Sequence, residues 1–537
     1  MQRTLAAAPA RATRPGGAAH RLALRSALAL AVAALALAPA ASAQDLASFE
    51  AKTTVHTLDN GWTFILVERP VAPVFSFSTF VDVGSAQEVP GITGLAHMFE
   101  HMAFKGTPNI GTTDYAAEKE ALEAMEAAYL AWQEARMQLH PDEARVAELR
   151  AAFEAAQEEA EQYVVPNEFG EVIDREGGTG LNAFTSADFT GYFYSLPANK
   201  TELFAFLESE RFLHPVFRQF YQERDVVQEE RRLRTESQPI GRLVEQFLAT
   251  AFVAHPYRQP TVGYMSDLQS FTLTDAQEFY ETYYGPSNMV TVVVGDIDPE
   301  RLIPVLERYF GRIAARPDPP ALRTVEPPQI AEKVLRMPDP SQPLYAEGYQ
   351  KPGATHPDQA VYDAIDDILS NGRTSRLYKR LVEEDKIAVF SASFSGFPGD
   401  KYKNLWMAYA VPTRGTSNEQ VQAAIREEIE RLKTEPVTDE ELARFKTRAK
   451  ADLLRGLRSN QGLANQLAEH HLLHGDWREL FRSIERLDAV TPADIQRVAR
   501  QTFTDTNRTV AMIVTEPGPE AGAAPAEGGT GGSAGGR

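Results

Sequence analysis

Two distant segments of the chain repeat the same order of polar and apolar positions. Residues 272–288 (TLTDAQEFYETYYGPSN) and 491–507 (TPADIQRVARQTFTDTN) align without a gap, and each begins at a threonine. Their apolar residues recur at helical spacing, which predicts an amphipathic helix with a threonine cap in both segments. A β-branched run follows each helix, VTVVVGD after the first and TVAMIVT after the second, and predicts a strand. This pattern indicates an internal repeat, with two unrelated helices of similar amphipathicity as the alternative.

The order of predicted elements indicates the fold class. Helices that start at threonine or serine recur between β-branched runs, which is typical of an α+β fold with helices packed on a mainly antiparallel sheet. Prolines in residues 313–329 (IAARPDPPALRTVEPPQ) exclude both a helix and a sheet interior, so we expect an extended connector there. With 537 residues, the chain exceeds one ordinary core. We therefore expect two homologous halves, residues 44–325 and residues 326–516.

The two ends of the chain differ from the rest in composition. Residues 1–43 carry five arginines, then an apolar run over residues 27–38, and end in Ala41-Ser42-Ala43. This order is typical of a secretory signal peptide, and the apolar run is short for a membrane span. Residues 517–537 are rich in Gly, Ala and Pro, which predicts a disordered tail. We expect a mature chain that starts near Gln44, has no membrane span and lies in the periplasm, with secretion as the alternative.

Charge and cysteine content limit the function classes. Loss of residues 1–43 would remove five arginines and no acidic residue, which lowers the net charge from −20 to −25. So acidic a chain does not attract nucleic acid, and we expect no nucleic-acid partner. The sequence contains no cysteine, which excludes disulfide bonds and a thiol nucleophile.

One pentapeptide carries the residue types that a metal site needs. Residues 97–101 read His-Met-Phe-Glu-His, inside a stretch of good helix formers without proline. On a helix, His97 and His101 share one face, and Glu100 projects beside them. Imidazoles are common zinc ligands, and a catalytic zinc site also needs a carboxylate as general base, the role that we assign to Glu100. For the bare motif, histidines that only pack or face solvent are the alternative.

A third metal ligand is expected downstream of this reversed zincin motif. In residues 223–232 (ERDVVQEERR), a charged helical stretch, Glu223 and Glu230 lie on the same face two turns apart. Spacing alone does not choose between these two carboxylates. A solvated helix face is the alternative for such a stretch.

Four sequence blocks occur in the order of a known family. They are residues 94–107 (GLAHMFEHMAFKGT), 177–185 (GGTGLNAFT), 223–230 (ERDVVQEE) and His255-Pro256-Tyr257 with Gly263. Together they resemble the pitrilysin/insulinase family of zinc peptidases, in the branch of mitochondrial processing peptidase and its bacterial relatives, and the resemblance spans residues 50–516. It implies two halves that face each other around a cavity. It also implies one Zn²⁺ per chain, held by His97, His101 and Glu230, while Glu223 orients the site.

The same resemblance implies a substrate-binding edge strand formed by Asn182, Ala183, Phe184 and Thr185. An extended peptide would pair with this strand through its main chain. Without the family, the nearby glycines would favour a plain turn before a strand. The implied activity is that of a zinc-dependent endopeptidase or oligopeptidase, which hydrolyses peptides or unfolded segments in an enclosed chamber. A non-catalytic scaffold or assembly subunit of the family is the alternative.

An insertion departs from the family pattern in the first half. Residues 114–164 are rich in Ala, Glu, Leu and Gln, with His140-Pro141 in the middle. This composition predicts two helices that form a hairpin. The hairpin lies at the chamber mouth or against a partner, or it is a solvated surface feature.

A second departure concerns the donors that would bind the substrate carbonyl. Relatives that are complete in one chain usually carry an Arg and, seven residues later, a Tyr for this purpose. Here the aligned positions hold Val382 and Val389, whose side chains cannot donate a hydrogen bond. We therefore expect a heterodimer in which a homologous subunit supplies the Arg and the Tyr. A homodimer or monomer with local donors, such as Tyr378 or Arg380, is the alternative.

Overall fold

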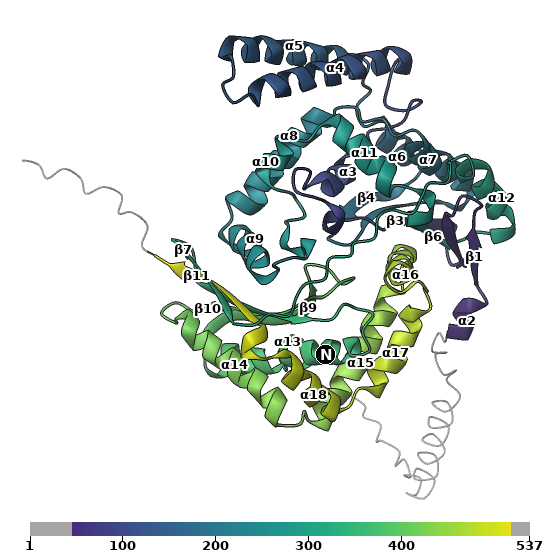
Figure 1. The fold of residues 1–537 in the computed structure, drawn as a ribbon. Coiled ribbons are helices and arrows are strands. Elements are labelled where there is room, and N and C mark those ends of the chain that lie inside the picture. The colour runs from purple at the N-terminus through teal and green to yellow at the C-terminus, as the bar shows by residue number, and fades with distance from the viewer. Residues whose placement is uncertain (1–45, 517–537) are drawn as a thin grey trace, which may run out of the picture. The chain divides into compact units, whose positions relative to one another are not determined.

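The computed structural model describes residues 46–516 (Figure 1). The predicted signal peptide and the predicted tail lie outside these residues. The chain divides into two compact units, residues 1–51 and residues 52–537. Of the first unit, the structure describes the short helix α2 (Leu46–Glu50). The second unit contains two sheets and the candidate site.

The first sheet has six strands in the order β1-β2-β6-β3-β5-β4. Their bounds are β1 (Thr53–Thr57), β2 (Thr63–Glu68), β3 (Val74–Val81), β4 (Thr179–Thr185), β5 (Thr190–Pro197) and β6 (Met289–Gly295). All neighbouring strands run antiparallel except β2 and β6. Strand β4 therefore forms one edge of the sheet, with its second edge unpaired within the described chain.

The second sheet has five strands in the order β7-β11-β8-β10-β9. Their bounds are β7 (Lys333–Asp339), β8 (Leu344–Lys351), β9 (Ala388–Phe397), β10 (Asn404–Pro412) and β11 (Arg508–Thr515). Only β7 and β11 run parallel. The order repeats that of the first sheet strand by strand, from β2-β6-β3-β5-β4 to β7-β11-β8-β10-β9. The predicted α+β class with two related halves is confirmed.

The two segments of the predicted sequence repeat occupy equivalent places in the halves. Helix α11 (Leu273–Tyr283) precedes β6, and helix α18 (Pro492–Thr502) precedes β11. Thr272 and Thr491 each form a capping box with the acidic residue three positions later. The threonines of the pattern are thus the helix caps that the sequence predicts.

The remaining α-helices surround the two sheets. In the first half they are α3 (Leu95–Met102), α4 (Tyr115–Arg136), α5 (Glu143–Glu161), α6 (Glu168–Arg175), α7 (Thr201–Leu213), α8 (Phe220–Arg231), α9 (Pro239–Ala251), α10 (Met265–Leu268) and α12 (Pro299–Phe310). In the second half they are α13 (Gln359–Ser370), α14 (Asn418–Thr434), α15 (Asp439–Gly456), α16 (Asn460–His474) and α17 (Glu479–Ala489). None of the helices within residues 46–516 is both long and apolar enough to cross a bilayer.

Each sheet packs on helices of its own half and also on a helix of the other half. Phe247 of α9, from the first half, lies in one buried cluster with Leu344 and Met407 of the second sheet. In return, α16 of the second half packs on β3 and β6 (Figure 1). There Gln461 donates to the carbonyl of Phe77 at 3.2 Å. The apolar face of each half is therefore partly buried by the other half.

The segment between α3 and β4 forms a pair of helices, α4 and α5, that pack against each other (Figure 1). Asp114 and Asp142 cap their N-termini. Phe153 of α5 contacts Tyr129 of α4, with ring centroids 5.2 Å apart. Farther along the chain, the proline-rich segment from residue 314 to 330 contains neither helix nor strand.

Candidate metal centre

Helix α3 begins at a residue that has no side chain to cap it. Gly94 occupies the N-cap position with φ of 97°, a conformation that favours glycine. Glu88, which is buried, takes over the capping role from outside the helix. Its carboxyl group accepts from Gly94 N–H at 2.8 Å and from Ala96 N–H at 2.7 Å. Burial raises the pKa of Glu88 to about 8.

The turn before α3 is held by a second carboxylate. Asp267 accepts from Gly91 N–H at 3.0 Å, from Thr93 N–H at 3.2 Å and from the Thr93 hydroxyl at 2.7 Å. A Cβ on Gly263 would collide with the Thr93 carbonyl, so only glycine allows this approach. The segment after His255-Pro256-Tyr257 thus fixes the start of α3. Sequence reasoning missed Glu88 and Asp267, because neither stands at a recognised capping distance.

Two histidines of α3 and one glutamate of α8 converge. Glu230 Oε2 lies 3.7 Å from His97 Nε2 and 3.2 Å from His101 Nε2. One ligand atom from each of these residues lies within 4.8 Å of the others, and no other such group of three occurs in the described part of the chain. The structure thus brings together the two histidines of the pentapeptide and the glutamate that the family resemblance implied as the third ligand.

Glu223 lies behind one of the histidines. Its Oε2 is 3.4 Å from His101 Nδ1, and its other oxygen pairs with Lys105 Nζ. The hydrogen bond with Glu223 is the main reason that the pKa of His101 is raised. Spacing along the helix could not decide which of Glu223 and Glu230 is the ligand. In the structure they contact opposite nitrogens of the His101 ring.

Glu100 faces the edge strand of the first sheet. Thr185, the last residue of β4, hydrogen-bonds the Glu100 carboxylate through its side chain and its backbone N–H. The Thr185 hydroxyl also lies 3.3 Å from the Ala96 carbonyl. Burial raises the pKa of Glu100, and the hydrogen bonds from Thr185 oppose part of that rise. A half-buried carboxyl group with a raised pKa is suited to both taking and giving a proton near neutral pH.

The residues predicted to bind substrate lie on β4 beside this carboxylate. Asn182 is exposed, Ala183 is buried, and Phe184 and Thr185 are half-buried. Among the described residues, strand β4 pairs with β5 on one side only. Its free edge presents backbone N–H and C=O groups, which an extended peptide can pair with.

The donor set fits a catalytic zinc ion. Two imidazoles and one carboxylate are a common ligand set of catalytic zinc, and three protein ligands leave a position open for the reaction. Burial lowers the pKa of His97 to about 4, so its ring is neutral, as a ligand must be. One feature departs from the usual pattern. His97 Nδ1 is buried without an acceptor among the described residues, whereas His101 has Glu223 at the equivalent atom.

The second half has a helix in the place that corresponds to α3. Helix α13 follows β8 as α3 follows β3, and Gly372 and Gly106, both with positive φ, come after these helices. At the spacing of His97, Glu100 and His101 before Gly106, the second half carries Asp363, Asp366 and Asp367 before Gly372.

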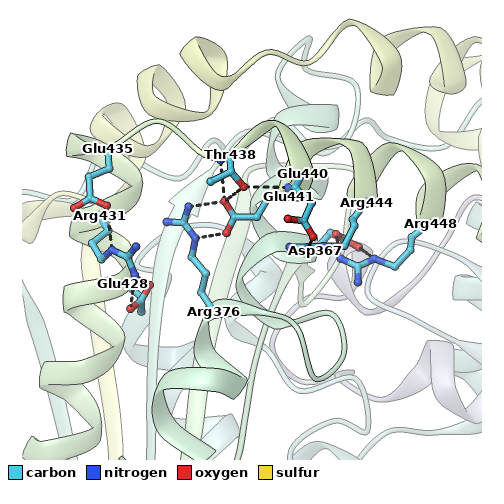
Figure 2. Close-up of polar contacts among 10 residues, drawn as sticks. All are labelled: Asp367, Arg376, Glu428, Arg431, Glu435, Thr438, Glu440, Glu441, Arg444 and Arg448. Atoms are coloured by element: carbon cyan, nitrogen blue, oxygen red, sulfur yellow. Dashed lines mark hydrogen bonds and ion pairs between the residues drawn. The ribbon is translucent and has the colours of Figure 1, made fainter. Parts of the chain in front are cut away.

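These aspartates make structural contacts. Asp366 accepts from Trp406 Nε1 at 2.6 Å and from the Ser395 hydroxyl at 2.5 Å. Asp367 pairs with Arg448 of α15 (Figure 2). Asp366 and Asp367 thus form structural contacts within the second half.

Val382 and Val389 occupy the two positions at which the family resemblance implies carbonyl donors. Val382 is partly buried against the core of that half, and Val389 lies on edge strand β9 with 62% of its surface exposed. Arg380 pairs with Asp385 at 2.9 Å and with Glu427 at 3.0 Å. Figure 2 shows Arg376 directed at Glu441, at 2.8 Å. Arg376 and Arg380 are thus both paired with carboxylates of the second half.

Comparison with known proteins gives two family matches. Residues 63–146 match the model described as insulinase (peptidase family M16), and residues 270–449 match the model described as peptidase M16 inactive domain.

Three similar proteins cover most of this chain. Zinc protease PqqE of Helicobacter pylori is 29% identical over 467 residues, which cover 85% of this chain and 91% of that protein. An uncharacterized zinc protease, YmxG of Bacillus subtilis, is 24% identical, with 84% and 95% covered. A probable mitochondrial-processing peptidase subunit beta of Arabidopsis thaliana is 23% identical, with 86% and 78% covered.

Solved structures share the fold. The crystal structure of a protease from Helicobacter pylori matches with a TM-score of 0.71 and 27% identity, over 86% of this chain and 99% of that one. The first half of the periplasmic protease PqqL from Escherichia coli matches with a TM-score of 0.63 and 19% identity, over 87% and 92%. At that lower identity, the likeness shows the fold alone.

Proposed function

Because the chain belongs to the pitrilysin/insulinase family, peptidase family M16, we propose that it is a zinc-dependent endopeptidase or oligopeptidase. The observation that carries this proposal is the convergence of His97, His101 and Glu230 from two helices, with Glu100 beside them. A relative with 29% identity and coverage of 85% of this chain is named a zinc protease. Peptides or unfolded segments are the proposed substrates.

One Zn²⁺ would be held by His97, His101 and Glu230. When bound, zinc supplies a Lewis acid for the scissile carbonyl and makes water acidic enough to ionise near neutral pH. Glu223 holds the ring of His101 in the orientation that points Nε2 at Glu230. This arrangement fixes the ligand before the metal arrives, which favours affinity.

Glu100 is the proposed general base and acid. Its carboxylate takes the proton of the attacking water and then gives it to the leaving amine. Thr185 orients this carboxylate and, as the last residue of β4, also sets its distance from a peptide paired with that strand. The peptide would lie extended along residues 182–185, which places its main chain beside the base.

A homologous partner subunit is the proposed source of the carbonyl donors. The side chains of Val382 and Val389 cannot donate a hydrogen bond. Arg376 and Arg380 are paired with carboxylates of the second half. The Arabidopsis relative is itself named as a subunit. We place this assembly in the periplasm on the basis of the predicted signal peptide.

A scaffold role is the second candidate, because a family model named for an inactive domain matches residues 270–449. Such a scaffold would need neither zinc nor Glu100. Zinc content by mass spectrometry separates the two functions, and an enzyme should contain one zinc per chain.

Glu100→Gln tests the proposed base. This variant should keep its zinc and lose turnover of a quenched-fluorescent peptide by at least about 100-fold, because the amide cannot accept the proton. His101→Ala serves as the contrasting variant, because it should lose the metal as well. Turnover by Glu100→Gln near the parental rate would show that the base is assigned wrongly. Full turnover by the purified parental chain alone would contradict the proposal that a partner subunit supplies the carbonyl donors.

A further inference from the structure

A buried carboxylate of the first half is inserted into a loop of the second half. Asp188 lies in the turn between β4 and β5 and is only 2% exposed. Its Oδ2 accepts from the backbone N–H groups of Asp400 at 2.6 Å and Lys401 at 3.0 Å. A Cβ on Gly399 would come within 2.6 Å of the same oxygen. Residues 399–401 thus form a backbone cradle for an anion that only glycine at position 399 leaves open.

The other contacts of Asp188 make this insertion specific. Its Oδ1 accepts from the Tyr257 hydroxyl, which in turn accepts from Tyr402 N–H at 3.2 Å. The ammonium group of Lys401 pairs instead with Asp82, at 2.5 and 2.6 Å. A buried carboxylate that relies on neutral donors is expensive to desolvate, so its contacts must all be made in the folded chain. The connection between the halves at this point is therefore sensitive to small changes.

Two short paths run from this turn to the metal centre. Along the strand, Thr185 stands three residues before Asp188 and hydrogen-bonds Glu100. Across the turn, the carbonyls of Ser186 and Ala187 accept from Ser85 N–H at 3.2 Å and Ala86 N–H at 2.9 Å. The segment that contains Ser85 and Ala86 continues to Glu88, which caps α3. The turn thus touches both the general base and the support of the metal-binding helix.

We propose that Asp188 is a positioning residue through which the second half fixes the geometry of Glu100 and of α3. The inference rests on the proposed peptidase function, because the geometry matters for that reaction. Among the described residues of the second half, no group of three side chains could hold a metal ion. In this proposal the second half nevertheless affects the rate of the reaction, because its loop holds Asp188. Asp188 itself contacts neither substrate nor metal ligands in this scheme.

The matched variants are Asp188→Asn and Asp82→Asn in the full chain. Both remove one carboxylate from a contact between the halves, but Asp82 pairs with Lys401 and does not bind the loop backbone. We expect kcat of Asp188→Asn to fall on the order of 10- to 100-fold with KM and zinc content little changed, because a displaced base costs rate and not affinity. Asp82→Asn should keep kcat within about twofold of the parent on the same argument. Equal kcat losses in both variants, or none in Asp188→Asn, would overturn the proposal.

A readout independent of activity separates this inference from the proposed function. In the metal-free chain, Asp188→Asn should increase amide hydrogen exchange in residues 94–102 and 182–187, and Asp82→Asn should not. If Asp188→Asn exchanges faster than the parent but the parental chain hydrolyses no peptide, the proposed function is wrong and the coupling stands. If the parental chain is active but Asp188→Asn matches it in both amide exchange and kcat, the coupling is wrong and the proposed function stands.

Gly399→Ala examines the same contact from the other half and serves if Asp188→Asn does not fold. The added methyl group should displace the Asp188 carboxylate and give the same loss of kcat. Combined with Asp188→Asn, it should cause little further loss, because both changes break one contact. Additive losses in the double variant would contradict a shared contact.

Discussion

Glu100, Glu223 and Glu230 are carboxylates of one small site, yet each contacts different atoms. Glu230 meets the Nε2 atoms of both histidines, Glu223 meets Nδ1 of His101, and Glu100 meets Thr185. These environments suit three roles, namely ligand, orienting group and base. At this scale, identical side chains are distinguished only by their neighbours, which a sequence does not list.

Glu223→Gln should weaken zinc binding without abolishing it. The amide keeps the size of the side chain but loses the charge that steadies His101, and loss of such a supporting contact typically costs about 10- to 100-fold in metal affinity. Competition with a chelator at fixed pH measures the change. Glu229→Gln is the matched control, because Glu229 lies exposed on the same helix and pairs with Arg232. Equal affinities in the two variants would show that Glu223 does not support the site.

Helix α3 shows which part of a structural element a sequence can predict. Its helical character and the shared face of His97 and His101 follow from local spacing, and both were predicted. Its anchors, Glu88 and Asp267, were not, because one reaches the helix from a preceding turn and the other from a segment far along the chain. No local pattern encodes such contacts.

Glu88→Ala should destabilise the fold by about 1–3 kcal/mol, because it leaves two buried N–H groups of α3 without an acceptor. Glu88→Gln should cost less, since it retains an acceptor oxygen and resembles the protonated acid that a pKa of about 8 favours at neutral pH. Urea unfolding of both variants measures the difference. A free energy of unfolding that is the same for Glu88→Ala and the parent would exclude Glu88 as the cap.

Helix α13 gives a prediction about pH. Burial raises the pKa of Asp366 to about 7, from 3.8 in the unfolded chain. Between these values the folded chain holds a proton that the unfolded chain has released, so stability falls as pH rises, by at most about 1.4 kcal/mol per pH unit. Asp366→Asn cannot titrate, so its stability relative to the parent should rise from pH 4 to pH 7. Parallel stability curves for the two proteins over this range would contradict the raised pKa.

At the scale of the whole molecule, the halves depend on each other for burial. Helix α9 covers apolar residues of the second sheet, and α16 packs on the first. A half on its own would expose these faces to water, at a cost of roughly 25 cal/mol for each Å² of apolar surface.

Residues 44–325 and 326–516, produced separately, should therefore be poorly soluble or loosely folded. Production of both pieces in one cell should restore a soluble complex that binds zinc. Size-exclusion chromatography with metal analysis checks both outcomes. Cooperative unfolding of either piece as a soluble monomer would show that the contacts between the halves are dispensable.

Much of the fold and part of the site could be predicted from the sequence. The repeated helix and strand predicted two related halves, and the H-x-x-E-H pentapeptide predicted two converging imidazoles. The choice of Glu230 over Glu223 came from family resemblance, because their spacing on one helix is compatible with either. Asp188 gave no signal at all, since the backbone N–H groups that it binds, those of Asp400 and Lys401, lie more than two hundred residues later, and Tyr257 lies 69 residues later. The chamber and the partner subunit stay predictions.

The equal spacing before Gly106 and Gly372 bears on how such a chain evolves. If the two halves arose by gene duplication, one metal-binding helix is enough for the reaction, and the corresponding positions of the other half can take a structural role. In this chain two of the corresponding positions hold Asp366 and Asp367, which join α13 to a tryptophan and an arginine of its own half. Ancestral reconstruction would test whether metal ligands once stood at these positions of the second half.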